Sequence, residues 1–125
     1  METALWTTQL LLAAIFLVTG LTKLSQPRAQ LAAGPMSWAA DVTDLEFHTV
    51  GLLEVLGALG LVLPGALGVA PLLTPLAAVG LAMAMIGAIL THARMGETDR
   101  LAVPLVLLGL TLFVAIERFG AYSLG

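Results

Sequence analysis

The sequence predicts an all-α integral membrane protein, a four-helix bundle with antiparallel up-down topology and short loops. Of its 125 residues, 59% are hydrophobic and 10% are charged, and the mean hydropathy is +1.03. Soluble domains carry about 25% charged residues, so these few charges would not cover the surface of a globule. A membrane helix takes about 20 apolar residues, and four such helices use most of the chain. We therefore expect residues 1–125 to form a single transmembrane domain.

The first span is expected over residues 4–23, because no charged side chain interrupts the run from Ala4 to Thr22. The N-terminal residues lack the basic region of a signal peptide, and the apolar run is long enough to cross the membrane. We expect this span to be a retained helix. The stretch that follows predicts a short helix after Pro27, and Trp38 is expected to rest at the membrane interface.

The second span is expected over residues 44–63. It begins with Thr43-Asp44-Leu45-Glu46, which has the pattern of a helix capping box, and it is expected to stop at Pro64. The uncharged residues 64–71 predict a short turn close to the bilayer.

The third span is expected over residues 75–94 and the fourth over residues 101–119. Pro75 and Pro104 fall in their first turns, where proline is tolerated. A polar loop, residues 95–100, separates the two spans.

The distribution of basic residues predicts the orientation. Lys and Arg favour the cytoplasmic side of a membrane protein. Four lie beside the first and third loops and one lies near the opposite end, namely Lys23, Arg28, Arg94 and Arg100 against Arg118. We expect a multi-pass protein of the inner (plasma) membrane with cytoplasmic first and third loops and both termini outside.

The composition also excludes several kinds of chemistry. The chain has no cysteine, so it carries no disulfide, thiolate nucleophile or iron–sulfur ligand. A net charge of −3 with five Lys and Arg gives no basic patch for nucleic acid.

Small residues at helical spacing predict how the spans pack, because close approach replaces the hydrophobic effect between helices in lipid. We interpret them as core-packing positions. They are Gln9, Ala13, Phe16 and Gly20 in the first span, and Gly51, Gly57 and Ala58 near Glu54 in the second. The third span offers two faces, one with Gly80, Met83, Ala84 and Gly87 and another with Leu81, Met85, Ala88 and His92.

Glu54 is the polar residue that most needs an explanation, because it lies near the middle of the second span. An ionised carboxylate there costs a few kcal/mol or more, so Glu54 is expected to face the bundle. Thr19 and Thr111 lie at a similar depth. We expect Lys23 to snorkel to the headgroups and to reach Glu54 only if the first helix is shifted or water intervenes. Two roles are open, a neutral interhelical hydrogen bond and a proton carrier or ligand contact in a polar cavity.

The two histidines lie near the same membrane level. His92 is either a wetted interface residue or part of the polar site with Glu54 and Lys23. His48 is rotated about 120° from Glu54 on the same helix, which favours an interface position. A haem or metal bound by His48 and His92 is a further alternative, although the sequence adds no other ligand pattern.

Several strings resemble the DoxX-like family of small bacterial four-helix membrane proteins. They are GLTKL at residues 20–24, GLLEVLG at residues 51–57, LTPLAA at residues 73–78 and THARMGE at residues 91–97. The resemblance covers essentially the whole chain and implies that Lys23, Glu54 and His92 occupy the family's recurring polar positions. The family name comes from a subunit associated with quinone-linked thiosulfate oxidation, and other relatives are linked to membrane complexes for oxidative or thiol stress.

Two function hypotheses follow. The first is a non-catalytic subunit or scaffold of a membrane redox or stress-response complex, with membrane or peripheral redox proteins or further copies of the chain as partners in the lipid bilayer. The second is a membrane-embedded site for a quinone or another lipophilic small molecule, in which Glu54 exchanges a proton or contacts the ligand. The sequence requires no cofactor, and it favours the first hypothesis, without enzymatic activity, because redox side chains are missing.

Overall fold

The structure, a computed structural model, describes residues 1–124. Its long helices are α1 (Glu2–Ser25), α3 (Asp44–Leu67), α4 (Leu73–Arg94) and α5 (Ala102–Phe119), joined by the short helix α2 (Arg28–Ala32) and the 3-10 helices η1 (Ser37–Asp41) and η2 (Thr98–Arg100). Among the described residues, four helical segments are long and apolar enough to cross a membrane. The predicted all-α four-helix membrane bundle is therefore confirmed.

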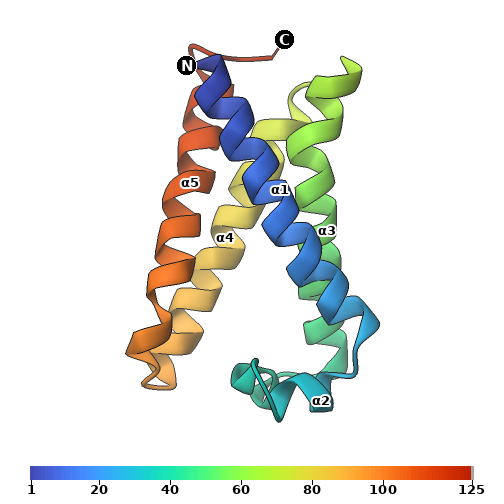
Figure 1. Ribbon diagram of the computed structural model, residues 1–125, viewed down its shortest axis with the longest axis vertical. Coiled ribbons are helices and arrows are strands. Elements are labelled where there is room, and N and C mark those ends of the chain that lie inside the picture. Colours follow the sequence, from blue (N-terminus) through green and yellow to red (C-terminus); the bar gives the residue numbers. More distant parts are fainter. Residues whose placement is uncertain (125) are drawn as a thin grey trace.

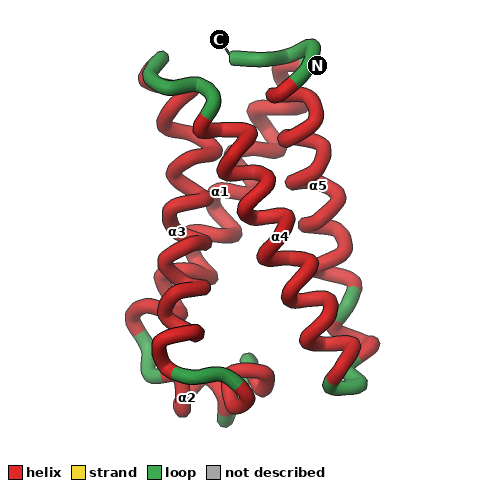
Figure 2. The backbone as a smooth tube through the Cα atoms, turned by 180° about the vertical axis from the view of Figure 1, so that it is seen from behind, coloured by secondary structure: helices red, strands yellow, loops and turns green. Residues whose placement is uncertain are grey.

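The long helices alternate in direction, and both termini lie at the same end of the bundle (Figure 1). We call this the terminal end, and the end that carries α2, η1 and η2 the loop end. Helix α1 packs mainly on α3, and α4 packs on α5. Seen from either side, the two pairs diverge toward the loop end (Figures 1 and 2).

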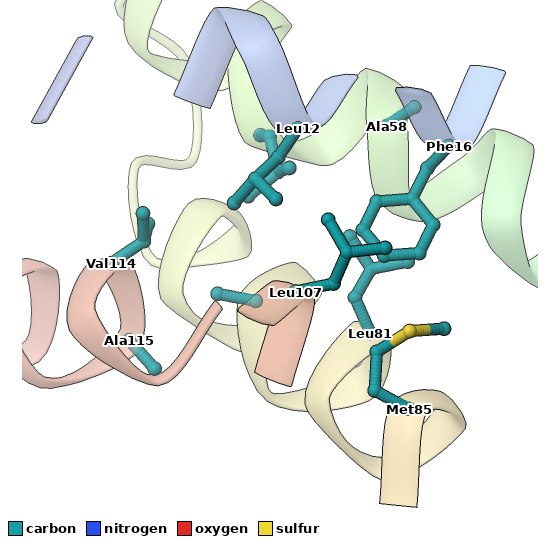
Figure 3. Close-up of a cluster of buried hydrophobic side chains, with 10 residues drawn as sticks. Leu12, Phe16, Ala58, Leu81, Met85, Leu107, Val114 and Ala115 are labelled. Atoms are coloured by element: carbon teal, nitrogen blue, oxygen red, sulfur yellow. The ribbon is translucent and has the colours of Figure 1, made fainter. Parts of the chain in front are cut away.

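The apolar core lies between the pairs, where Phe16 of α1 points toward Leu81 and Met85 of α4 and Leu107 of α5 (Figure 3). On α1 three residues of the predicted stripe, Gln9, Phe16 and Gly20, are buried and the fourth, Ala13, is half-buried. On α4 the structure buries residues of the second predicted face, Leu81 and Met85, rather than the first. The buried residues of this helix include Ala78, Leu81 and Met85, whereas a Cβ added at Gly80 or Gly87 would meet no other part of the protein within 4 Å. Helical periodicity alone does not distinguish between two apolar faces.

Helix α3 begins as predicted and ends later than predicted. Thr43 Oγ1 accepts the Glu46 N–H at 3.1 Å, and the Glu46 carboxylate accepts the Thr43 N–H at 3.3 Å, which completes the capping box. The helix then passes Pro64 and ends at Leu67, followed by Gly68 with a φ of +66°.

The proline is tolerated because a neighbouring helix supplies the hydrogen bond that it lacks. A proline at position 64 has no N–H to donate to the carbonyl of Gly60, one turn earlier. Thr74 of α4 donates its hydroxyl to that carbonyl at 2.9 Å instead. The same contact joins the ends of α3 and α4 at the turn between them.

Helices α1 and α3 approach closely where two glycines meet. A Cβ added at Gly51 would lie 2.8 Å from Lys23 Cβ and 3.0 Å from the Gly20 carbonyl oxygen. A Cβ added at Gly20 would lie 2.7 Å from the Gly51 carbonyl oxygen. No side chain fits between the two backbones at this level, and this contact places the polar residues of α1 beside those of α3.

Candidate functional site

Lys23 and Glu54 form a buried ion pair between α1 and α3. Lys23 Nζ lies 2.7 Å from Glu54 Oε1, and the two side chains are 8% and 5% exposed. The expectation that Lys23 snorkels away and needs a shift or a water to reach Glu54 was wrong. The Gly20–Gly51 contact brings the helices close enough for a direct contact.

The second carboxylate oxygen of Glu54 also has a partner on α1. Thr19 donates its hydroxyl to Glu54 Oε2 at 2.5 Å. The expected alternative, Thr111, donates to the Leu108 carbonyl of its own helix at 2.9 Å. Glu54 Oε1 forms the ion pair with the Lys23 ammonium but accepts no hydrogen bond of good geometry within the described chain. This oxygen can therefore still accept a hydrogen bond from a ligand.

These groups line one cavity of about 350 Å³, which we call the polar cavity. Its walls come from α1, η1, α3 and α4, and include Lys23, Trp38, Glu54, Thr91 and His92. The volume falls in the range of small-molecule sites, which are mostly apolar with a few placed polar groups. The three residues predicted for the site, Lys23, Glu54 and His92, therefore share one cavity.

His92 contributes a buried nitrogen without a hydrogen bond. Its side chain is 14% exposed, and within residues 1–124 its Nδ1 has no hydrogen-bond partner. The carboxylate of Glu97 lies 3.8 Å from that nitrogen, beyond hydrogen-bond distance. Native proteins pair nearly all buried polar atoms, so an orphan nitrogen at a cavity wall needs an explanation.

Trp38 lines the cavity and Glu97 lies beside it near His92, although the sequence did not predict a site role for either residue. Trp38 was expected at the membrane interface, and its ring centroid lies 5.9 Å from Lys23 Nζ, within cation–π range. The Ser37 hydroxyl donates to Glu97 at 3.3 Å, and Arg100 Nη1 donates to the Pro35 carbonyl at 3.1 Å. The segment before α3 is thus joined to the α4–η2 connection at the loop end of the cavity.

His48 lies outside the cavity. Its Nδ1 is 2.7 Å from the Asp44 carbonyl oxygen, one turn earlier on the same helix. The structure therefore does not bring His48 and His92 to one cavity, and the described residues contain no group of three or more His, Asp or Glu side chains arranged for a metal ion.

Arg118 forms a second buried polar cluster, at the terminal end. The sequence places it near the end opposite the first and third loops, and there its side chain is fully buried. Its Nε donates to Gln9 Oε1 at 2.8 Å, its Nη1 donates to Glu2 at 2.9 Å, and its guanidinium lies 5.6 Å from the centre of the Trp6 ring. Two polar residues near the start of α1, Glu2 and Gln9, could have indicated that a buried cation lies beside them.

The fold and the cavity define a small integral membrane protein with a four-helix bundle and a buried charged site opening between its helices. The sequence model of the DoxX-like family matches residues 7–114, which is most of the chain. The chain belongs to the DoxX-like family. No curated protein and no solved structure matched it in the corresponding comparisons.

Proposed function

We propose that the protein binds a lipophilic small molecule of the quinone class in the polar cavity. The observation that carries the proposal is the convergence of Lys23, Glu54 and His92, from three different helices, on one cavity of about 350 Å³. The carbonyl oxygens of a quinone accept hydrogen bonds, and the cavity offers the Lys23 ammonium and the His92 Nδ1, which has no hydrogen-bond partner within the described chain. Glu54 contacts the ligand or exchanges a proton with it.

The position of the cavity within a membrane bundle supports the same class of ligand. Its lining includes apolar residues such as Val50, Ala84 and Met85 beside the charged ones. An ionisable residue inside a membrane protein indicates a functional site by default, because its burial is costly. A lipophilic ligand reaches such a site from the bilayer, where it is already dissolved.

Binding can be measured through Trp38, which lines the cavity. The second tryptophan, Trp6, lies at the terminal end beside Arg118, so Trp6→Phe leaves Trp38 as the single fluorescent reporter. We expect decylubiquinone to quench Trp38 saturably in lipid nanodiscs. Quenching that rises linearly with quinone content, as for random collision in the bilayer, would overturn the proposal.

Two matched pairs of variants test the residues. Glu54→Gln in the Trp6→Phe background is expected to weaken binding at least about tenfold, because the carboxylate no longer holds the Lys23 ammonium, the charged donor to the quinone carbonyl, in place. Glu117→Gln removes an acid outside the cavity and should have no effect. Because Glu54→Gln also breaks the ion pair, His92→Gln against His48→Gln provides a second comparison that leaves the pair intact.

The role as a non-catalytic subunit or scaffold of a redox or stress-response complex stays a prediction. It is compatible with ligand binding, because the cavity would then be this subunit's contribution to the complex. Purification from native membranes that yields the lone protein, under conditions that preserve known complexes, would count against it.

A further inference from the structure

An apolar groove continues from the polar cavity along α3 and α4. Its volume is about 640 Å³, and its lining includes Leu53, Leu76 and Met83, whose side chains are exposed on the surface of the bundle. In a membrane bundle such apolar exposed side chains face lipid. Val50 and Ala84 line both the groove and the polar cavity, so the two spaces adjoin.

The charged and imidazole groups are confined to one of these two spaces. Lys23, Glu54 and His92 line the polar cavity, whereas the lining of the groove within the described chain consists of Val, Leu, Met, Ala and Gly residues. The polar cavity and the apolar groove together would therefore match an amphiphilic ligand. Its polar head would lie beside the Lys23–Glu54 ion pair and its apolar part in the groove, which is open to the bilayer.

Side-chain contacts bridge the loop end of the cavity, and α3 and α4 touch along the floor of the groove. The contacts of Ser37 with Glu97 and of Arg100 with the Pro35 carbonyl connect the segments on the two sides of the loop end. A Cβ added at Gly80, in the groove, would meet no other part of the protein within 4 Å. A Cβ added at Gly57 would lie 2.7 Å from Leu81 and one at Gly60 2.7 Å from Ala77, so the groove has a closed floor and its open side faces outward, toward lipid.

We propose that the ligand is an amphiphile with one long hydrocarbon chain, which leaves the cavity laterally along the α3–α4 groove into the bilayer. Its polar head lies beside Lys23, Glu54 and His92. The inference rests on the proposed function of the polar cavity and adds the shape of the ligand and its route. The chain follows Val50 and Ala84 into the groove and passes Gly80.

Filling the groove tests the route. Gly80→Leu places a side chain in the groove while it raises helix propensity, so the helix should not lose stability. The matched control is Gly109→Leu on α5, where an added Cβ also meets nothing within 4 Å. Decylubiquinone and the same quinone without its decyl chain are compared by Trp38 quenching in the Trp6→Phe background, in nanodiscs of identical lipid.

We expect Gly80→Leu to weaken binding of the decyl compound about tenfold, which corresponds to the cost of overpacking a filled space. Binding of the chainless quinone should stay unchanged, and Gly109→Leu should affect neither compound. Equal weakening of both compounds, or of neither, would overturn the lateral route and leave the cavity proposal standing. Absence of saturable binding of both compounds to the parent protein would overturn the proposed function itself.

A second measurement locates the chain directly. A decyl quinone with a diazirine at the end of its chain is expected to label groove residues such as Leu53, Leu76 and Met83 after illumination. Labelling spread evenly over exposed residues of α5, such as Val103 and Val106, would contradict the route.

Discussion

Lys23 and Glu54 form an ion pair within the bundle, with Lys23 Nζ 2.7 Å from Glu54 Oε1 and both side chains almost fully buried. Burying either charge alone costs several kcal/mol, and mutual attraction offsets this cost when the geometry is close. The hydroxyl of Thr19 adds a hydrogen bond to the carboxylate. The ion pair therefore joins α1 to α3 and also places charged groups in the wall of the polar cavity.

Removing one partner of this pair should be more damaging than removing both. Lys23→Met leaves the Glu54 carboxylate buried without its counter-charge, and we expect a loss of about 3–5 kcal/mol in the free energy of unfolding. The double variant Lys23→Met, Glu54→Leu should recover most of that loss. The measurement is denaturant unfolding in mixed micelles, followed by circular dichroism.

The exposed pair between Arg28 and Asp44 is the control. Its paired atoms, Arg28 Nε and Asp44 Oδ1, are almost as close at 2.8 Å, but the Asp44 side chain is 75% exposed. Asp44→Asn should cost no more than about 1 kcal/mol, as for other surface pairs. Equal costs at Asp44 and Lys23 would contradict the assignment of Lys23–Glu54 as a buried ion pair.

The contact between Gly20 and Gly51 predicts that an alanine at position 51 lowers the free energy of unfolding, although alanine has the higher helix propensity. A Cβ added at Gly51 would lie 2.8 Å from Lys23 Cβ, so α1 and α3 must separate. We expect Gly51→Ala to destabilise by about 1–3 kcal/mol through overpacking. Gly109→Ala, at an open position, should stabilise by up to about 1 kcal/mol. Unfolding measurements on the two variants compare the signs, and stabilisation by Gly51→Ala would refute the close contact.

The hydrogen bond from Thr74 to Gly60 predicts a coupling with Pro64. Thr74→Val leaves the Gly60 carbonyl without a donor, at an expected cost of about 1–3 kcal/mol. In a Pro64→Ala background the alanine N–H can donate to that carbonyl, so the same substitution should cost less. A double-mutant cycle of unfolding free energies measures the difference. Additive effects at the two sites would show that Thr74 does not replace the missing proline hydrogen bond.

Much of the fold could be predicted from the sequence because a bilayer imposes a length on each apolar run. The burial of Gln9, Gly20 and Glu54 followed from helical spacing and from the cost of polar groups in lipid. These are properties of one helix at a time. The same spacing gave two candidate faces on α4, and the choice between them depends on the neighbouring helices.

The contacts that the sequence did not predict each depend on a second helix. Lys23 reaches Glu54 because two glycines let α1 and α3 meet, and α3 passes Pro64 because a residue of α4 supplies the hydrogen bond. His92 became a site candidate through the resemblance to the DoxX-like family, but its shared cavity with Trp38 required the position of η1. Crossing geometry between helices is what hydropathy and periodicity leave undetermined.

The cluster around Arg118 predicts that two of its partners differ in importance. Glu2 is 54% exposed, so water can solvate it, whereas Gln9 is fully buried and accepts from Arg118 Nε at 2.8 Å. Gln9→Leu leaves that donor buried without an acceptor, and we expect a loss of about 1–3 kcal/mol. Glu2→Gln should cost less than about 1 kcal/mol, because the pair is partly screened by solvent. Unfolding free energies of the two variants test the order, and a larger cost for Glu2→Gln would show that charge pairing, rather than the buried hydrogen bond, holds the guanidinium in place.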